Sequence, residues 1–284
     1  MLLTFIRLAS PRPIRQSLQA LIVCSALFLT LRASAQESNE AQPFSCTATY
    51  EVAKEKKVQA RGHCTTRVSP ASTFKLPLAV MGYDSGVLID SISPVWEIPG
   101  AADGAIQGVR HGNPTSWQKQ SLIWYSRELT RTLGRSRLER YVQQFSYGNM
   151  DVSRGPGNSD GVISSWLGGS LQISPVEQVE FLDALLRHKL AASVRAQQAA
   201  IAIVPQFHST AGWRVHGKTG STWLHDRKGR AVKERPVGWF VGWAERGSRT
   251  VLFASLNVAD KQSSTPHGLE VRDQFLSGID ALLD

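Results

Sequence analysis

Strand-like segments at both ends of the chain enclose a middle with helical patterns, and this order constrains the fold more than any other feature. Each segment is rich in β-branched and aromatic residues and is bounded by turn residues. The predicted strands cover 45–53, 57–66, 213–223, 237–245 and 250–259. Segments so far apart can share a sheet only if the chain ends return to one another. We therefore predict an α+β domain whose antiparallel sheet is built from both chain ends.

The middle of the chain is expected to supply a helical region that flanks this sheet. The predicted helices cover 72–85, 121–133, 137–145, 174–190 and 268–283. The fourth begins with Ser174-Pro175-Val176-Glu177, a capping box with proline at the first helical position. Glycine and proline are frequent in 86–120 and 153–161, which we predict to be loops. Between the last two strands, Arg246-Gly247-Ser248-Arg249 predicts a hairpin turn.

The first 35 residues carry the features of a secretory signal peptide. Arg12 and Arg15 precede an almost wholly apolar run from 18 to 31, and Ala33-Ser34-Ala35 is a cleavage site of the A-x-A type. The apolar run is shorter than the roughly 20 residues that span a bilayer. We expect a mature domain over 36–284 that is exported to the bacterial periplasm without a stable membrane anchor.

Export also changes the interpretation of the cysteines. Cys24 leaves with the leader, and a lipid attachment there is disfavoured because the bulky Val23 precedes it. The mature chain keeps Cys46 and Cys64, and an even number of cysteines in an oxidising compartment predicts one disulfide. Two separate buried thiols are the alternative.

Neither the charge nor the histidines indicate a nucleic-acid or metal partner. The net charge is +9, but the leader holds four arginines and no acidic residue. Without the leader, 28 basic and 23 acidic residues remain, a mild charge of +5. The seven histidines form no H-x-x-x-H or H-x-H pair, so we expect no metal site.

Ser72-Thr73-Phe74-Lys75 is an S-x-x-K motif at the start of a predicted helix. The i, i+3 spacing puts the hydroxyl and the amine on one face. A lysine can take the proton of a serine only if burial disfavours its charged form, and apolar neighbours would supply that burial. The motif is weak alone, since Ser116-Trp117-Gln118-Lys119 has the same spacing among polar neighbours. We expect Lys119 to stay protonated and solvated.

Two further segments make the pattern more specific. Lys218-Thr219-Gly220 lies in a predicted strand, where the lysine can hold a carboxylate and glycine lets a ligand approach the backbone. Ser121 is predicted to open a helix, and its hydroxyl could relay a proton. Taken separately, the first fits an exposed strand end and the second an N-cap. The ordered set of S-x-x-K, Ser and K-T-G is a penicillin-recognising arrangement.

Further motifs place this arrangement in a family. In order, the chain has P-A-S-T-F-K at 70–75, S-L-I-W-Y-S at 121–126, Tyr147-Gly148-Asn149, Trp166 before S-L-Q-I-S-P-V-E-Q at 170–178, K-T-G at 218–220 and G-W-F-V-G-W at 238–243. Over nearly the whole mature chain it resembles the class D serine β-lactamases, the oxacillinases. The Tyr-Gly-Asn motif and the tryptophan distinguish class D, whereas class A would have Ser-Asp-Asn at Ser121.

The resemblance implies the penicillin-recognising fold and hydrolysis of the β-lactam amide of penicillin-type antibiotics, which confers resistance. It implies Ser72 as nucleophile, Lys75 carboxylated by CO2 as general base, and Ser121 with Lys218 as the proton relay to the lactam nitrogen. The implied substrate-binding residues are Thr219, Ser221, Arg272, Trp166 and Ile123. No metal and no other cofactor is implied.

The roles of these binding residues differ. The backbone N–H groups of Ser221 and Ser72 would form the oxyanion hole. Thr219 and Arg272 would bind the substrate carboxylate, and Trp166 would donate its indole N–H to the carbamate on the active-site lysine. From the residues alone, a solvated Arg272 and an ordinary core Trp166 remain open.

The chain departs from the family pattern at two of the implied positions. Ile123 stands where the family usually has valine, and Ser221 is polar where many relatives carry a larger or apolar side chain. Tyr147 and Asn149 are expected to shape the site rather than to react.

Two rival functions share these motifs. A penicillin-binding peptidase would act on cell-wall peptides with the same serine and lysine. A β-lactam sensor domain would be acylated without turnover. Both would normally carry a membrane anchor or further segments, which we do not find in the sequence.

Overall fold

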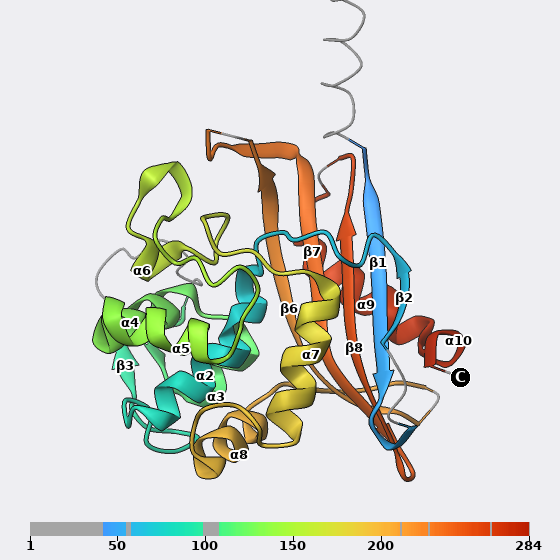
Figure 1. Ribbon diagram of the computed structural model, residues 1–284, viewed down its shortest axis with the longest axis horizontal. Helices are drawn as coiled ribbons and strands as arrows, with labels where there is room; N and C mark the ends of the chain where they lie inside the picture. The colour runs from blue at the N-terminus through green and yellow to red at the C-terminus, as the bar shows by residue number, and fades with distance from the viewer. Residues whose placement is uncertain are drawn as a thin grey trace, which may run out of the picture. The chain divides into compact units, whose positions relative to one another are not determined.

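The two ends of the chain meet in one antiparallel sheet (Figure 1). The computed structural model describes residues 42–54, 58–98, 108–210, 212–226, 228–261 and 263–283. Here β1 (Phe44–Glu51) pairs with β2 (Gln59–Gly62) on one side and with β8 (Arg249–Val258) on the other. The strand order β2-β1-β8-β7-β6-β5 confirms the predicted α+β class. The predicted signal peptide, 1–35, lies outside the described residues.

The C-terminal strands carry most of the sheet. They are β5 (Gln206–His208), β6 (Arg214–His225) and β7 (Ala231–Arg246), and a separate short pair is formed by β3 (Trp96–Glu97) and β4 (His111–Gly112). β7 and β8 form the predicted hairpin, in which Arg246 pairs with Arg249. β7 begins earlier than predicted, because its first residues pair with the end of β6 after a bulge at Trp223 and Leu224.

The helices come mainly from the middle of the chain. They are α2 (Lys75–Asp84), α3 (Pro114–Gln120), α4 (Ile123–Leu133), α5 (Arg135–Gln144), α6 (Gly161–Ser164), α7 (Pro175–Leu186), α8 (Val194–Ala202), α9 (His267–Ser277) and α10 (Ile279–Leu283). Short 3-10 turns are η2 (Val52–Lys54), η3 (Ala71–Phe74) and η4 (Pro156–Asn158). In the described part of the chain, none of the helices is long and apolar enough to cross a membrane.

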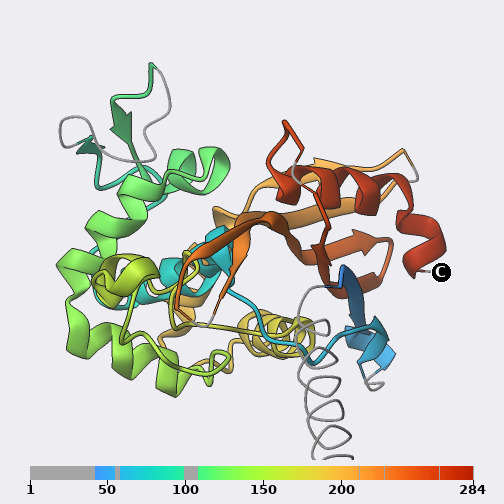
Figure 2. The same ribbon diagram turned by 90° about the horizontal axis from the view of Figure 1, so that it is seen from above.

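The sequence of β7 explains why helices cover both faces of the sheet. Successive side chains of a strand point to opposite faces. Trp239 and Val241 enter the core shared with the helical region, whereas Phe240 and Ala244 enter a second cluster with α9. Figure 2 shows the red C-terminal helices on the other side of the sheet from the green helical region.

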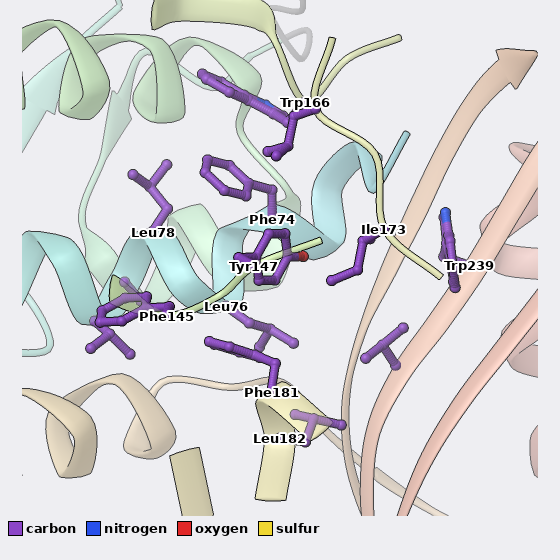
Figure 3. Close-up of a cluster of buried hydrophobic side chains, with 14 of the residues drawn as sticks. Phe74, Leu76, Leu78, Phe145, Tyr147, Trp166, Ile173, Phe181, Leu182 and Trp239 are labelled. Atoms are coloured by element: carbon purple, nitrogen blue, oxygen red, sulfur yellow. The ribbon is translucent and has the colours of Figure 1, made fainter. Parts of the chain in front are cut away.

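The larger core gathers aromatic side chains beside the S-x-x-K segment (Figure 3). Phe74 stacks on Trp166 with ring centroids 5.3 Å apart and meets the edge of Tyr147 at 5.6 Å. Tyr147 in turn meets Phe181 of α7 at 5.2 Å. These contacts fix η3 and the start of α2 to the centre of the fold.

Several predicted boundaries were wrong for local reasons. The predicted loop 86–120 contains α3, because Asn113 caps the helix through a capping box with Ser116 and Pro114 occupies its first position. α7 stops at Leu186 rather than Leu190, since His188 takes a positive φ of 55°. The predicted closing helix is divided at Gly278. α8 and β5 were not predicted.

The predicted disulfide is confirmed. Cys46 of β1 is bonded to Cys64, which follows β2, with Cα atoms 5.1 Å apart. Both residues are buried. The bond closes a loop between residues 18 positions apart and ties the edge strand β2 to the sheet.

Replacing Cys46 and Cys64 together by alanine should lower the free energy of unfolding by about 3 kcal/mol, because the loop is no longer closed in the unfolded chain. Urea unfolding of the wild type with and without reductant provides the control. Thiol titration of denatured periplasmic protein should find no free thiol, and two free thiols would contradict the pairing.

Candidate active site

The S-x-x-K motif is folded as a 3-10 turn that continues into a helix. Ser72 lies in η3, and Lys75 is the first residue of α2. Nζ of Lys75 donates to Oγ of Ser72 over 3.1 Å, and only 1% of Lys75 is exposed. The residue before the serine, Ala71, has a left-handed φ of 49°, and it turns the chain sharply into the helix.

Burial determines the protonation of Lys75. Its pKa lies well below the ordinary lysine value, mainly because burial disfavours the charged form and further because Lys218 repels it. The flanking Phe74 and Leu76 are buried as well. The lowered pKa favours the neutral amine that a base beside a serine requires.

The second S-x-x-K motif has the opposite surroundings. Lys119 is exposed at the end of α3. Oγ of Ser116 takes part in the capping box with Asn113 and so stabilises the helix start. As expected, the two lysines differ in their surroundings, since Lys119 is exposed and Lys75 is buried.

The K-T-G segment lies on β6 and meets the second serine. Nζ of Lys218 donates to Oγ of Ser121 at 3.0 Å and to the carbonyl of Thr219 at 3.1 Å. Burial, together with the positive charge of Arg272, lowers the pKa of Lys218 to about 7. An amine with this pKa can both give and accept a proton near neutral pH.

Ser121 does not open a helix as predicted. It is the C-cap of α3, with a left-handed φ of 58°, and α4 begins two residues later at Ile123. Ser121 therefore lies in the tight turn between two helices. This turn brings its hydroxyl to Lys218 on the sheet.

Gly220 allows the strand and the nucleophile segment to approach closely. A Cβ on Gly220 would lie 2.8 Å from the carbonyl oxygen of Pro70 and 3.3 Å from Cβ of Ala71. Any other residue would push β6 away from η3. The glycine thus keeps Lys218 beside Ser72, and its role in the predicted motif is one of close packing.

A pocket of about 790 Å³ opens over these residues. Of the residues predicted for the site, it is lined by Ser72, Ser121, Ile123, Lys218, Thr219, Ser221 and Arg272. The facing wall comes from the 202–207 segment and from Leu269, and much of it is apolar. The pocket therefore combines a buried polar group at Ser72 with an apolar wall, as small-molecule sites usually do.

Trp166 is not part of the pocket lining. It is fully buried and stacks on Phe74 (Figure 3). Its carbonyl accepts a hydrogen bond from Oγ of Ser69 at 2.6 Å. Its assignment to substrate binding is thus not supported by the lining, while the indole–carbamate bond stays a prediction.

Tyr147 and Asn149 are bonded within the framework of the site. The Tyr147 hydroxyl lies 3.3 Å from Oε1 of Gln178, whose Nε2 donates to Thr73 at 2.9 Å. Nδ2 of Asn149 donates to the carbonyl of Ser170 at 2.8 Å. Both residues shape the loops around η3, as expected.

Two residues of the site were missed from the sequence. Ser69 bonds Trp166 as described, and its carbonyl accepts from the indole of Trp239 at 3.0 Å. Nε2 of Gln118 donates to the carbonyl of Lys75 at 2.8 Å, so α3 is tied to the catalytic helix. No local pattern in the sequence indicates this bond, because its two residues are 43 positions apart.

Arg272 lines the pocket from α9 and is held from two sides. Its guanidinium donates to Oδ1 of Asp273 at 2.8 Å and lies 5.4 Å from the centre of the Phe207 ring. The side chain is 25% exposed, so the charge is reachable from the pocket.

Replacing Arg272 by alanine should weaken acylation efficiency by roughly 10- to 100-fold, since a charge-assisted hydrogen bond contributes about 1.5–3 kcal/mol. The melting temperature should change little. Arg131→Ala is a matched control, because Arg131 also pairs with a neighbouring carboxylate on a helix, at 2.8 Å from Glu128, but lies outside the pocket lining. Unchanged kinetics in the Arg272 variant would show that this arginine binds no substrate.

The described residues contain no cluster of side chains that could bind a metal ion. Within 42–54, 58–98, 108–210, 212–226, 228–261 and 263–283, no group of three or more His, Cys, Asp or Glu side chains could hold a metal ion.

Comparison with known proteins gives a consistent set of relatives. A family model described as the penicillin binding protein transpeptidase domain matches residues 34–279. β-Lactamase OXA-9 of Klebsiella pneumoniae is 42% identical over 259 residues, which cover 89% of this chain and 93% of the relative. β-Lactamase OXA-1 of Escherichia coli is 26% identical, with coverages of 92% and 95%. Among solved structures, the class D β-lactamase OXA-427 superposes with a TM-score of 0.76 at 35% identity and covers 84% of this chain and 98% of its own.

Proposed function

Because this chain belongs to the class D β-lactamases, within the penicillin-binding transpeptidase family, we propose that it hydrolyses the amide bond of penicillin-type β-lactams and so confers antibiotic resistance. The observation that carries the proposal is the 3.1 Å hydrogen bond between Ser72 and the buried Lys75 at the base of a pocket. Ser72 is the nucleophile and forms an acyl-enzyme.

Acylation uses the groups around the pocket in a fixed order. Oγ of Ser72 attacks the lactam carbonyl carbon and gives up its proton to the base on Lys75. The backbone N–H groups of Ser72 and Ser221 stabilise the oxyanion. As the carbon–nitrogen bond breaks, Ser121 passes a proton to the nitrogen and recovers one from Lys218. The 3.0 Å Ser121–Lys218 contact and the Lys218 pKa of about 7 support this relay.

The substrate carboxylate is bound on the side of the pocket that β6 and α9 form. Arg272 and Lys218 supply positive charge, and the Thr219 hydroxyl adds a donor. Because a bound anion favours the protonated form of Lys218, substrate binding would raise the pKa of this lysine. The lysine then enters the reaction with the proton that Ser121 needs.

Carboxylation of Lys75 by CO2 fits the residues present. CO2 reacts with neutral amines, and burial lowers the pKa of Lys75 and so favours its neutral form. The nearby Lys218 could balance the charge of a carbamate. When formed, this group would supply an anionic carboxylate on Lys75 as the base for the proton of Ser72 and for that of the hydrolytic water. Ile123 lines the pocket, and its extra methylene would narrow the access of water to the site.

Nitrocefin hydrolysis by the purified mature chain tests the proposed function. We expect many turnovers per molecule, with the rate unchanged after exhaustive treatment with EDTA. A single acylation without turnover would indicate a β-lactam sensor. Release of D-alanine from cell-wall peptides without β-lactam hydrolysis would indicate a peptidase, and zinc-dependent recovery after chelation would contradict the serine mechanism.

The place of action is the periplasm. We propose that residues 1–35 are removed as a signal peptide, and the sequence pattern of this leader is the support. N-terminal sequencing of periplasmic protein should begin at Gln36.

A further inference from the structure

The imidazole of His225 occupies the space over Gly168, two residues after Trp166. A Cβ placed on Gly168 would lie 1.9 Å from Cε1 of the ring and 2.4 Å from Nε2. The ring therefore rests directly on the glycine. The φ of Gly168 is +90°, a conformation that side chains rarely adopt, so this contact depends on a glycine.

The glycine under the ring is bonded to the nucleophile segment. Its N–H donates to Oγ of Ser69 at 2.8 Å, and the same hydroxyl donates to the carbonyl of Trp166 at 2.6 Å. Ser69 lies three residues before Ser72. The Ser69 hydroxyl thus links both Trp166 and Gly168 to the turn that carries the nucleophile.

A bulge brings His225 to this position. The register of β6 and β7 shifts between Trp223 and Leu224, so that Leu224 pairs with Val232. Beyond the bulge, the end of the β6–β7 hairpin lies beside the segment of α6 (Figure 1). A second contact supports this, since the N–H of Gly157 donates to the carbonyl of Gly229 at 3.4 Å.

The ring itself is suited to packing. His225 is half-buried, and Nδ1 lies 2.9 Å from the carbonyl of Trp223, which fixes the plane of the ring. Burial lowers the pKa of His225, while the neighbouring Asp226 opposes this shift. The neutral imidazole is accordingly the form that covers Gly168 near neutral pH.

We propose that His225 is a positioning residue for the reaction, which holds Gly168 and thereby Trp166 against Phe74 and the adjoining Lys75. The inference rests on the proposed function and adds to it a residue outside the pocket lining. Trp166 stacks on Phe74 at 5.3 Å, so a shift of its segment changes the surroundings of Lys75 while the pocket walls stay in place. The step that depends most on the base at Lys75 is deacylation.

His225→Ala should therefore slow deacylation by roughly 10- to 100-fold, the effect of a small misplacement of a catalytic group. The burst of acylation should stay close to that of the wild type, and the bicarbonate concentration for half-maximal activity should rise. His225→Phe should recover most of the activity, because its flat ring can cover Gly168. These quantities are measured by stopped-flow kinetics with nitrocefin in degassed buffer with added bicarbonate.

His63→Ala is the matched control, because His63 is exposed near β2 at the other end of the sheet order. This variant should leave the rates of acylation and deacylation unchanged. The inference would be overturned if His225→Ala folds, deacylates at the wild-type rate and needs no more bicarbonate than the wild type. In that case, turnover by the wild type would still support the proposed function. A wild type without turnover would overturn both. If His225→Ala does not fold, His225→Leu keeps the apolar bulk without the flat ring, and wild-type kinetics in that variant would also overturn the inference.

Discussion

Replacing Ser72 by alanine should abolish β-lactam turnover, with a fall in kcat on the order of 10⁶-fold, as found for serine nucleophiles that act with a base. Lys75 would lose its hydrogen-bond partner at 3.1 Å, but the small side chain removed leaves the fold intact. The melting temperature should stay close to that of the wild type. Nitrocefin kinetics and thermal unfolding measure the two effects.

Ser116→Ala is the matched control, since Ser116 begins the other S-x-x-K motif. It removes one bond of the α3 capping box and should cost about 1 kcal/mol of stability, but it should keep most of the activity. Mass spectrometry of a complex with a slow substrate should find the acyl group on Ser72. An adduct on Ser116 would refute the assignment of the nucleophile.

Activity should also depend on dissolved CO2 and be lost in acid. The pKa of Lys75 lies below its usual value because of burial, so the amine is neutral at higher pH and becomes protonated only as the pH falls through this lowered pKa. A protonated amine cannot carry a carbamate. Degassed enzyme at low pH should therefore be inactive, and bicarbonate should restore activity after return to neutral pH.

Two variants distinguish the effect of losing the base on Lys75 from the effect of losing its neighbour Trp166. In Lys75→Ala, deacylation should suffer most, because a missing general base typically costs about 10²–10⁴-fold, and the variant should accumulate acyl-enzyme if it is still acylated. Trp166→Ala should need more bicarbonate than the wild type, as an anion in an apolar site loses a donor. Carbon-13 NMR with labelled bicarbonate should show one carbamate signal. Full activity at low pH without bicarbonate, together with an unmodified Lys75, would contradict the prediction.

The sheet and the site were predictable to different degrees. Strand alternation and the chain order indicated the sheet, because each strand buries residues at a period of two. The motif residues Ser72, Ser121 and Lys218 were also found, and they meet around one pocket. Each of these features depends on residues that are close together in the sequence.

Features that depend on distant neighbours were not predictable. The bonds of Ser69 to Trp166 and Trp239 join residues about 100 or more positions apart, and nothing beside Ser69 indicates them. α3 was missed because its flanking Gly and Pro residues suggested a loop, although Asn113 and Pro114 mark its start. The left-handed turn at Ser121 joins α3 to α4, and its contact with the sheet is made by Lys218, 97 positions later.

The pairing of β1 with β8 also governs how the chain can fold. Phe44 lies opposite Val258, roughly 200 residues later, so this contact closes a very large loop and folding should be slow. Until β8 has been synthesised, β7 has an open edge and β1 has only β2 as a partner. We therefore expect that a growing chain cannot complete this sheet until most of it has been synthesised. The same order predicts that chains cut short before β8 aggregate through the exposed edge of β7 instead of forming a partly active enzyme.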